Sequence, residues 1–398
     1  MRSVDSSGAH ALERRGIIAA LHPEAQRFAD WARAHAVAAD WPWMVDAARA
    51  HKVAALLAAR VEACGLADAV GAAPAAALRE VRDDAAARAI ASEHTLARLT
   101  DVFGAAAVPF FVVKGSLLSQ HVYRDLRLRR FADVDVVVRG ADVGRAEAAL
   151  RALDYRPGGV EEILAAPPQR PADRDRAHAL ARRFQARQLL AYAWYAPAGG
   201  ALLAVDLHWH VAPARLHVPE AALWAETEMA PVGDTLVRTF TPAATLIHLA
   251  VHATTALLSG FRLMHLCDVA WAARHYAAHA DAMWALADQW RVRRHLLVVF
   301  GMIERVLHIE LPLALPARAP RRIADRWLQA ATAEPFLFDA PNHKRLPLSR
   351  RLWPEVQWSV AMGSLRRNGA VISAVGLARL RFALFQWQQN RAAPTPPA

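Results

Sequence analysis

Strand-like segments are confined to the middle of this chain, and helical patterns fill the sequence on either side. Within residues 10–105, aromatic and apolar residues recur at the i, i+3, i+4 spacing of one helix face. The residues that share this spacing are Phe28 with Trp31, and Trp41 with Met44 and Val45. From Thr241 onward helical patterns return, over Ala243–Leu258 and Leu263–Ala278. The sheet of such a protein must therefore be small and flanked by helices.

The middle of the chain alternates short apolar runs with turn signals. Glycines between the last two runs indicate a hairpin. The expected strands are residues 108–113, Val134–Val138, Gln188–Tyr195 and Ala201–His210, and the expected helices are Ser116–Tyr123 and a helix through Leu153 that Asp142 caps. We therefore expect an α+β protein with a small mixed β-sheet core (residues 106–240) between an N-terminal helical region (1–105) and a C-terminal helical domain (241–398).

Composition excludes several classes of protein. The 398 residues are 55% apolar, which is enough to bury sizeable cores. No apolar run reaches the length of a membrane span, and the N-terminus lacks the pattern of a secretory signal. Cys64 and Cys267 are too few for a disulfide framework or an all-cysteine zinc site, and they suit a reducing compartment. These observations favour a cytoplasmic protein.

The basic charge has two interpretations. The net charge is +11, and all but three of the basic residues are arginine, the exceptions being Lys52, Lys114 and Lys344. A basic balance is typical of proteins that bind nucleotides or nucleic acid. The alternative is a solvated, arginine-rich surface that reflects compositional drift.

Asp133 and Asp135 are the first candidate site residues. Residues two apart on a strand point to the same face, so two carboxylates project side by side from a segment otherwise built of valine. Like charges at this distance resist ionising together, and a divalent cation removes the conflict. The alternative is a pair of ordinary surface carboxylates at the end of a strand.

Two further segments complete a possible phosphate-transfer site. Lys114-Gly115-Ser116 stands at a strand-to-helix junction, where glycine lets backbone approach a phosphate and the helix start offers free N–H groups. Asp206 lies on a later apolar strand and shares its face with His208 and His210. Three strand-borne carboxylates near a phosphate-binding turn are typical of a two-metal site.

This order of motifs resembles the polymerase-beta-like nucleotidyltransferase superfamily, and most closely its bacterial branch of uncharacterised nucleotidyltransferases. That branch has Lys-Gly, an aromatic residue, an arginine, Asp-x-Asp, and later Asp-Leu-His-Trp. These motifs correspond here to Lys114-Gly115, Tyr123, Arg129, Asp133-Val134-Asp135 and Asp206-Leu207-His208-Trp209. The long gap between Ser116 and Asp133 fits the branch, whereas many members of the wider superfamily have an apolar residue in place of Lys114.

The resemblance implies transfer of a nucleoside monophosphate from an NTP, such as ATP, to an acceptor hydroxyl, with Mg²⁺ or Mn²⁺ as cofactor. It implies that Asp133 and Asp135 bind the metals and that Asp206 completes the set and activates the acceptor. The implied nucleotide-binding residues are Lys114, Gly115, Ser116 and Arg129. For Lys114 the alternative is a salt bridge to a nearby Asp, and for Arg129 an ion pair with Asp125 or Asp133.

Four histidines are candidates for acceptor binding or for support of the site. His208 and His210 share the face of Asp206, although hydrogen-bonded imidazoles at a sheet edge are the alternative. His248 and His252 lie four apart on an expected helix, but Leu249 stands where a zinc protease has Glu. We expect them to join Arg262 and Asp268 in a polar patch or a buried polar network.

Two other functions compete with this prediction. A catalytically inactive nucleotide-binding scaffold would have the same fold, but the three carboxylates are intact. A toxin-like transferase acting on tRNA would need a basic groove, and the arginines between Arg170 and Arg187 are a candidate for it or for a solvated helix. The acceptor, whether small molecule, glycan precursor, peptide or RNA, stays open, as does the oligomeric state.

Overall fold

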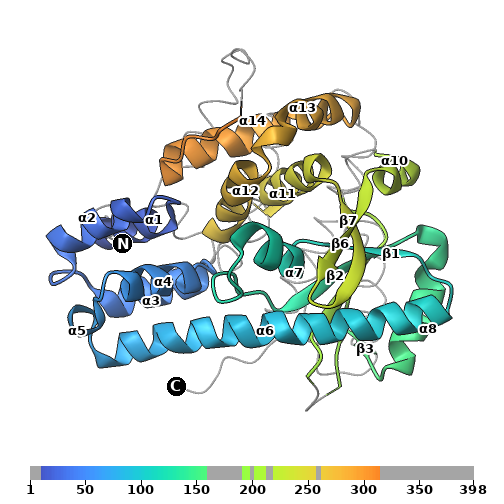
Figure 1. Ribbon diagram of the computed structural model, residues 1–398, viewed down its shortest axis with the longest axis horizontal. Coiled ribbons are helices and arrows are strands. Elements are labelled where there is room, and N and C mark those ends of the chain that lie inside the picture. The colour runs from blue at the N-terminus through green and yellow to red at the C-terminus, as the bar shows by residue number, and fades with distance from the viewer. Residues whose placement is uncertain (1–9, 159–190, 198–200, 212–217, 257–260, 314–398) are drawn as a thin grey trace, which may run out of the picture.

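The computed structural model describes residues 10–158, 191–197, 201–211, 218–256 and 261–313 of the chain. The expected Arg-rich segment between Arg170 and Arg187 lies outside these residues. Figure 1 shows one mixed sheet with helices at both ends of the chain packed around it, as the sequence predicts.

Six helices precede the sheet. They are α1 (Ala11–Leu21), α2 (Ala25–His35), α3 (Trp41–Ala50), α4 (Ala54–Ala63), α5 (Ala67–Val70) and α6 (Ala72–Ala105). The aromatic residues that predict the inner faces of α2 and α3 are buried, with Phe28 fully enclosed and Trp41 only 2% exposed. Helix α6 runs across most of the width of Figure 1, below α3, α4 and α7 in that view.

The described sheet has seven strands in the order β3-β4-β5-β2-β1-β7-β6. Their bounds are β1 (Phe110–Val113), β2 (Asp133–Val138), β3 (Arg156–Pro157), β4 (Ala191–Tyr195), β5 (Ala204–His208), β6 (Thr227–Val232) and β7 (Thr235–Phe240). Strand β2 is antiparallel to β1 and parallel to β5, and β1 is parallel to β7. The sheet is therefore mixed, as predicted.

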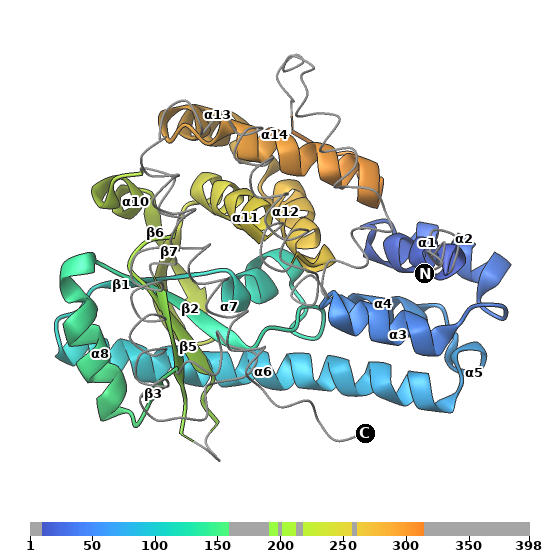
Figure 2. The same ribbon diagram turned by 180° about the vertical axis from the view of Figure 1, so that it is seen from behind.

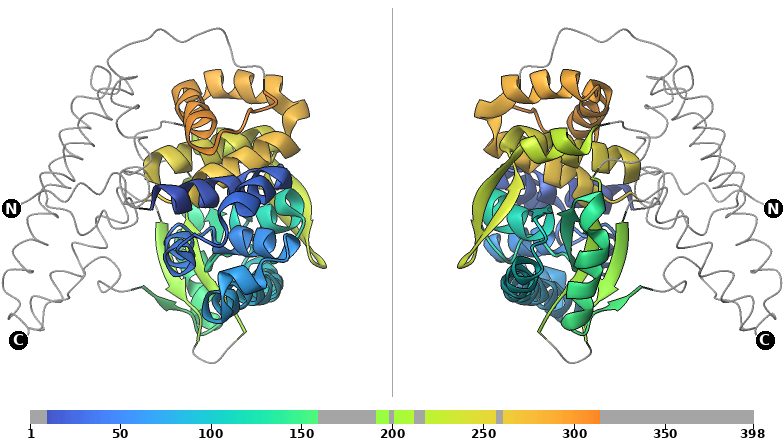
Figure 3. Two further views of the ribbon diagram at one scale, coloured as in Figure 1. Left: turned by 90° about the vertical axis from the view of Figure 1, so that its left-hand side faces the viewer. Right: turned by 90° about the vertical axis from the view of Figure 1, so that its right-hand side faces the viewer.

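The two faces of β2 belong to different layers. Val134, Val136 and Val138 pack in one apolar cluster with α6 and α8 (Val143–Ala152). Val137 belongs to the other cluster, which includes the C-terminal helices, and Asp133 and Asp135 point to the same side as Val137. In the end views of Figure 3 the C-terminal helices lie above the sheet and α6 lies below it.

The C-terminal helices form the upper layer. They are α10 (Glu220–Ala225), α11 (Pro242–Ala256), α12 (Leu263–His275), α13 (Ala280–Gln289) and α14 (Arg293–Met302), followed by the π-helix η6 (Ile303–Leu307). Helix α11 packs against α12, α13 and α14. One apolar cluster joins them to α1–α4, so the two helical regions share a core, and the predicted domain boundaries stay a prediction. No helix within the described ranges has both the length and the hydropathy of a membrane-crossing segment.

Two local expectations need correction, and one hairpin was not predicted. The expected helix from Ser116 begins at Gly115 as α7 (Gly115–Leu117) and widens into the π-helix η1 (Leu118–Tyr123). Asp142 precedes α8 but makes no side-chain cap bond, because its carboxylate pairs with Arg145. The hairpin β6–β7 was not predicted, since its strands carry polar residues and a proline.

Candidate functional site

The three predicted carboxylates lie on neighbouring strands of one sheet face. In the parallel pairing of β2 with β5, Asp135 stands opposite Asp206, and Asp133 lies two residues before Asp135 on the same side. Asp135 is only 7% exposed. The side chain of Asp206 is 31% exposed, so this carboxylate stands at the open side of the cluster.

Two cationic side chains contact this acidic cluster. Lys114 Nζ donates a hydrogen bond of 2.7 Å to Asp135 Oδ1. His208 Nε2 lies 3.2 Å from Asp135 Oδ1 and 3.1 Å from Asp206 Oδ2, and so it bridges the two carboxylates. The salt bridge expected as one alternative for Lys114 is thus present, and Asp135 is its partner.

The charges of this cluster support one another. Burial alone would raise the pKa of Asp135, but Lys114 and His208 hold that pKa well below its ordinary value. Burial would likewise lower the pKa of His208, yet Asp206 and Asp135 raise it to about 9. Asp133 behaves differently, because burial and the two neighbouring carboxylates raise its pKa. The cluster therefore neutralises Asp135 and leaves Asp133 as the carboxylate that gains most from an added cation.

The Lys114-Gly115-Ser116 turn packs directly against the start of β2. Lys114 has φ 59°, a left-handed conformation that is strained for a residue with a side chain. A Cβ on Gly115 would lie 3.1 Å from the ring of Phe131, so glycine allows this close approach. The hydroxyl of Ser116 is buried and makes no hydrogen bond to the described residues. Its predicted contact with a phosphate stays a prediction.

Arg129 lies beneath this turn in a buried polar network. Its Nε and Nη2 donate to the two carboxylate oxygens of Asp268, at 2.8 and 2.7 Å. Tyr123 donates to the same carboxylate at 3.0 Å, and Arg129 Nη1 donates to the carbonyl of Gly115 at 3.4 Å. The partner is thus Asp268 on α12, neither Asp125 nor Asp133. The guanidinium orients the turn from below, and its predicted contact to a triphosphate stays a prediction.

The other candidate histidines occupy different surroundings. Strand β5 ends at His208, and His210 Nε2 donates to the carbonyl of Val218 at 2.8 Å, which places His210 outside the cluster. On α11, His248 and His252 stack with ring centroids 6.3 Å apart, and His252 contacts His265 of α12. Burial, aided by the charge of Lys114, lowers the pKa of His248 to about 3. These imidazoles are neutral, and His265 connects them to Arg262, whose backbone N–H donates to His265 Nδ1 at 3.1 Å, while Asp268 binds Arg129. A shared role of His248 and His252 at the site stays a prediction.

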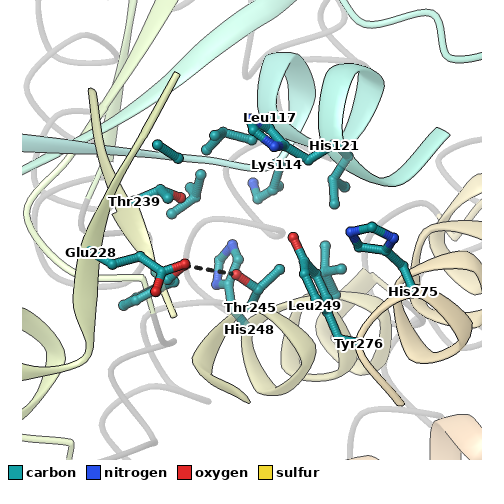
Figure 4. Close-up of a pocket in the computed structure, with 14 residues that line it drawn as sticks. Lys114, Leu117, His121, Glu228, Thr239, Thr245, His248, Leu249, His275 and Tyr276 are labelled. Carbon is teal, nitrogen blue, oxygen red and sulfur yellow. Dashed lines mark hydrogen bonds between the residues drawn. The ribbon is translucent and has the colours of Figure 1, made fainter. Parts of the chain in front are cut away.

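A cavity of about 150 Å³ adjoins Lys114 on the side away from β5. It lies between the ends of β1 and β7, the π-helix η1 and helix α11. Figure 4 shows the His248 ring and the Tyr276 hydroxyl directed toward Lys114 across this space. A cavity of this size holds a group of about six heavy atoms, so a whole nucleotide does not fit.

Comparison with known proteins identifies the family. A family described as uncharacterised nucleotidyltransferase matches residues 25–308 of the chain. The chain belongs to this nucleotidyltransferase family. No curated protein matches it. Among solved structures, the antibiotic-resistance factor ANT(2'')-Ia is similar at 13% identity and a TM-score of 0.33, over 52% of this chain and 94% of that chain.

The donor set of this member of the nucleotidyltransferase family fits a divalent cation. One ligand atom each from Asp135, Asp206 and His208 lie within 4.8 Å of one another, close enough to share an ion. Two carboxylates suit Mg²⁺ or Mn²⁺, and an imidazole also suits transition metals. Asp133 is not part of this compact group, although it lies on the same face of β2.

The roles of two residues at the candidate site were not predicted from the sequence. Asp268 was expected near His248 rather than as the partner of Arg129, because a contact across 139 residues leaves no local pattern. Lys52 was noted only as a rare lysine, although its charge acts on the pKa of Asp133. The scarcity of lysine was a signal that could have indicated Lys52. Of the three lysines, Lys114 contacts Asp135, and the charge of Lys52 acts on the pKa of Asp133.

Proposed function

We propose that this protein is a metal-dependent nucleotidyltransferase that moves a nucleoside monophosphate from an NTP to an acceptor hydroxyl and releases pyrophosphate. The observation that carries the proposal is the register of β2 and β5, which gives Asp133, Asp135 and Asp206 one common face. Membership of a nucleotidyltransferase family supports the same reaction class.

The metal would be Mg²⁺ or Mn²⁺, held by Asp135 and Asp206 with Asp133 beside them. When bound, such an ion screens the charge of the phosphates and increases the acidity of a nearby hydroxyl. His208, which bridges Asp135 and Asp206, would either join the ligands or hold the carboxylates in place. Lys114 would remain beside Asp135, where its ammonium group can also face a phosphate oxygen.

The reaction would proceed by direct displacement at the α-phosphorus. The acceptor oxygen forms a bond to the α-phosphorus, and the bond from that phosphorus to the oxygen that bridges to the β-phosphorus breaks. Pyrophosphate leaves with the electron pair of the broken bond. His208 contacts Asp135 and Asp206, and Asp206 is the more exposed of these two carboxylates. Asp206 would therefore accept the proton of the acceptor hydroxyl.

The direct test combines nucleotide binding with turnover. Purified protein is incubated with Mg²⁺ and each labelled NTP, with and without cell extract as a source of acceptors. We expect Mg²⁺-dependent NTP binding in the wild type and its loss in Asp133→Asn/Asp135→Asn. Transfer of label to an extract component would support catalysis. If the double variant binds NTP with Mg²⁺ as well as the wild type does, the metal site is wrong.

The runner-up functions give different results in the same assay. A nucleotide-binding scaffold would bind NTP without transferring label to any component of the extract. A transferase acting on tRNA would label RNA, and ribonuclease treatment would remove the labelled product.

A further inference from the structure

A second cavity, of about 440 Å³, lies between the N-terminal helices and the segment that leads into β2, where Arg130 stands three residues before Asp133. Its walls are the turn between α3 and α4, one face of α6, and the segment that leads into β2; they carry Arg49, Lys52, Ala54, Glu80, Val81, Asp84 and Arg130. In Figure 2, α3 and α4 lie beside α12 and the region of α7. The cavity has several times the volume of the one at Lys114 and can admit a polyphosphate chain.

The turn that carries Lys52 is fixed to α12. His51 is fully buried; its ring accepts a hydrogen bond from the backbone N–H of Leu263 (3.2 Å), and its carbonyl accepts one from Met264 (3.3 Å). Lys52 itself has φ 59°, a left-handed conformation that costs a side-chain-bearing residue about 1 kcal/mol. The turn ends α3, with the backbone N–H of Val53 bonded to the carbonyl of Ala48 (2.8 Å), and it therefore holds Lys52 at a defined position.

Lys52 differs from the other cations of this cavity in its contacts. Arg49 pairs with Glu80 at 3.2 Å, and Arg130 pairs with Asp84. Lys52 makes no ion pair with any described residue, so its ammonium group is available to a ligand. Burial is the main cause that lowers the pKa of Lys52; Arg262 adds to it, while Asp133 raises the pKa.

With Arg49 and Arg130 paired, Lys52 is the cation of this cavity whose charge an anionic ligand would compensate. An NTP whose α-phosphate lies at the carboxylates must direct its β- and γ-phosphates away from them. The cavity that Lys52 lines offers these phosphates a cation and space, and its wall includes Arg130, three residues before Asp133. A lysine ammonium suits this role, because it is a compact point charge with three donors.

We propose that Lys52 binds the β- and γ-phosphates of the NTP, and that the N-terminal helical region thereby forms one wall of the nucleotide site. The inference depends on the proposed nucleotidyl transfer, and it adds a phosphate-binding residue from outside the sheet. It also gives a physical reason for a lysine at a left-handed position in a chain that otherwise uses arginine.

The test uses Lys52→Gly, because glycine adopts φ 59° without strain and so removes the cation without harming the fold. Arg291→Gly is the matched control, since Arg291 is exposed, has φ 58° and lies in the turn between α13 and α14. Both variants are compared with wild type and Lys52→Arg for binding of Mg²⁺-NTP, of the nucleoside monophosphate, and of inorganic tripolyphosphate without metal.

We expect Lys52→Gly to weaken NTP binding by roughly 10- to 100-fold, the effect of losing a charged hydrogen bond. Binding of the monophosphate should stay unchanged, Lys52→Arg should restore part of the NTP affinity, and Arg291→Gly should match wild type. Tripolyphosphate binding should fall with Lys52→Gly alone. Equal NTP affinity in wild type and Lys52→Gly, or an equal loss for the monophosphate, overturns the inference.

The design separates this inference from the proposed function. If Asp133→Asn/Asp135→Asn abolishes NTP binding while Lys52→Gly does not, only the role of Lys52 is wrong. If wild type binds no NTP but binds tripolyphosphate through Lys52, the nucleotidyl transfer is wrong and the phosphate site is retained. If wild type binds neither, both are wrong.

Discussion

Lys114 occupies the position in the acidic cluster where an external cation would otherwise be needed. Its side chain is 13% exposed and that of Asp135 is 9% exposed, so the pair is largely removed from water. Removing one partner of a buried pair leaves an uncompensated charge, which costs more than the pair itself contributes. The stability of the cluster and its affinity for metal should therefore depend on each other.

We expect Lys114→Met to lower the free energy of unfolding by about 3 kcal/mol in the presence of a chelator. Saturating Mg²⁺ should restore part of this loss, because a bound cation replaces the missing charge. The same Mg²⁺ should raise the free energy of unfolding of wild type by a smaller amount. Urea unfolding followed by circular dichroism measures both effects.

The control for this variant is Arg33→Met, which breaks an exposed pair with Asp30 whose side chains are 72% and 57% exposed. It should cost less than about 1 kcal/mol and should not respond to Mg²⁺. A Lys114→Met protein as stable as wild type in chelator would show that the pair does not stabilise the cluster.

At the scale of elements, the sequence predicts what depends on neighbours along the chain. Alternation in Asp133–Val138 predicts both the strand and the common side of its two carboxylates, and the same alternation relates Asp206 to His208. Alternation fails for His210, because the strand ends at His208. The pairing of β2 with β5 joins Asp135 to Asp206 across 71 residues, and the family resemblance rather than the pattern indicated it.

Contacts between distant elements were not predictable in this way. The sequence predicted a triphosphate contact for Arg129, with an ion pair to Asp125 or Asp133 as the alternative, whereas Asp268 on α12 is its bidentate partner. The phosphate contact of Gly115 stays a prediction; a Cβ at this position would meet the ring of Phe131. The partner of Arg129 was set by the packing of elements that are far apart in the sequence.

The pair of Arg129 with Asp268 connects α12 to the segment before β2, and a double-mutant cycle can measure this connection. Arg129→Met and Asp268→Leu should each lower the free energy of unfolding by about 3–5 kcal/mol, because each leaves a buried charge unpaired. The double variant should lose clearly less than the sum, since it leaves neither charge. Additive losses in urea unfolding would contradict a direct coupling of the two side chains.

At the scale of the whole molecule, the N- and C-terminal helices share one apolar core that also reaches β1 and β2. Several imidazoles lie in or beside this core as neutral groups. Among them, Thr254 Oγ1 and His295 Nδ1 lie 2.6 Å apart and join α11 to α14. Burial lowers the pKa of His295 to about 4 from its ordinary value of 6.5.

This shift makes the core sensitive to acid. A histidine with a lowered pKa in the folded protein contributes stability that is fully present above pH 6.5 and is lost as the pH falls through about 4, because the unfolded chain takes up the proton first. For His295 the loss amounts to about 2–3 kcal/mol by about pH 4.5. His295→Asn keeps an acceptor near Thr254 but cannot be protonated in this range.

The variant should therefore be less stable than wild type near neutral pH, and the difference should shrink or reverse between about pH 6.5 and about pH 4. Urea unfolding of both proteins across this pH range measures the difference between their free energies of unfolding. The two proteins have the same carboxylates, so the titration of these groups cancels in the difference. His35→Asn serves as a control for the substitution itself, because His35 lies exposed in the last turn of α2. A difference between His295→Asn and wild type that is constant with pH would mean that His295 titrates alike in the folded and unfolded chain, and the acid sensitivity of the shared core would then have another origin.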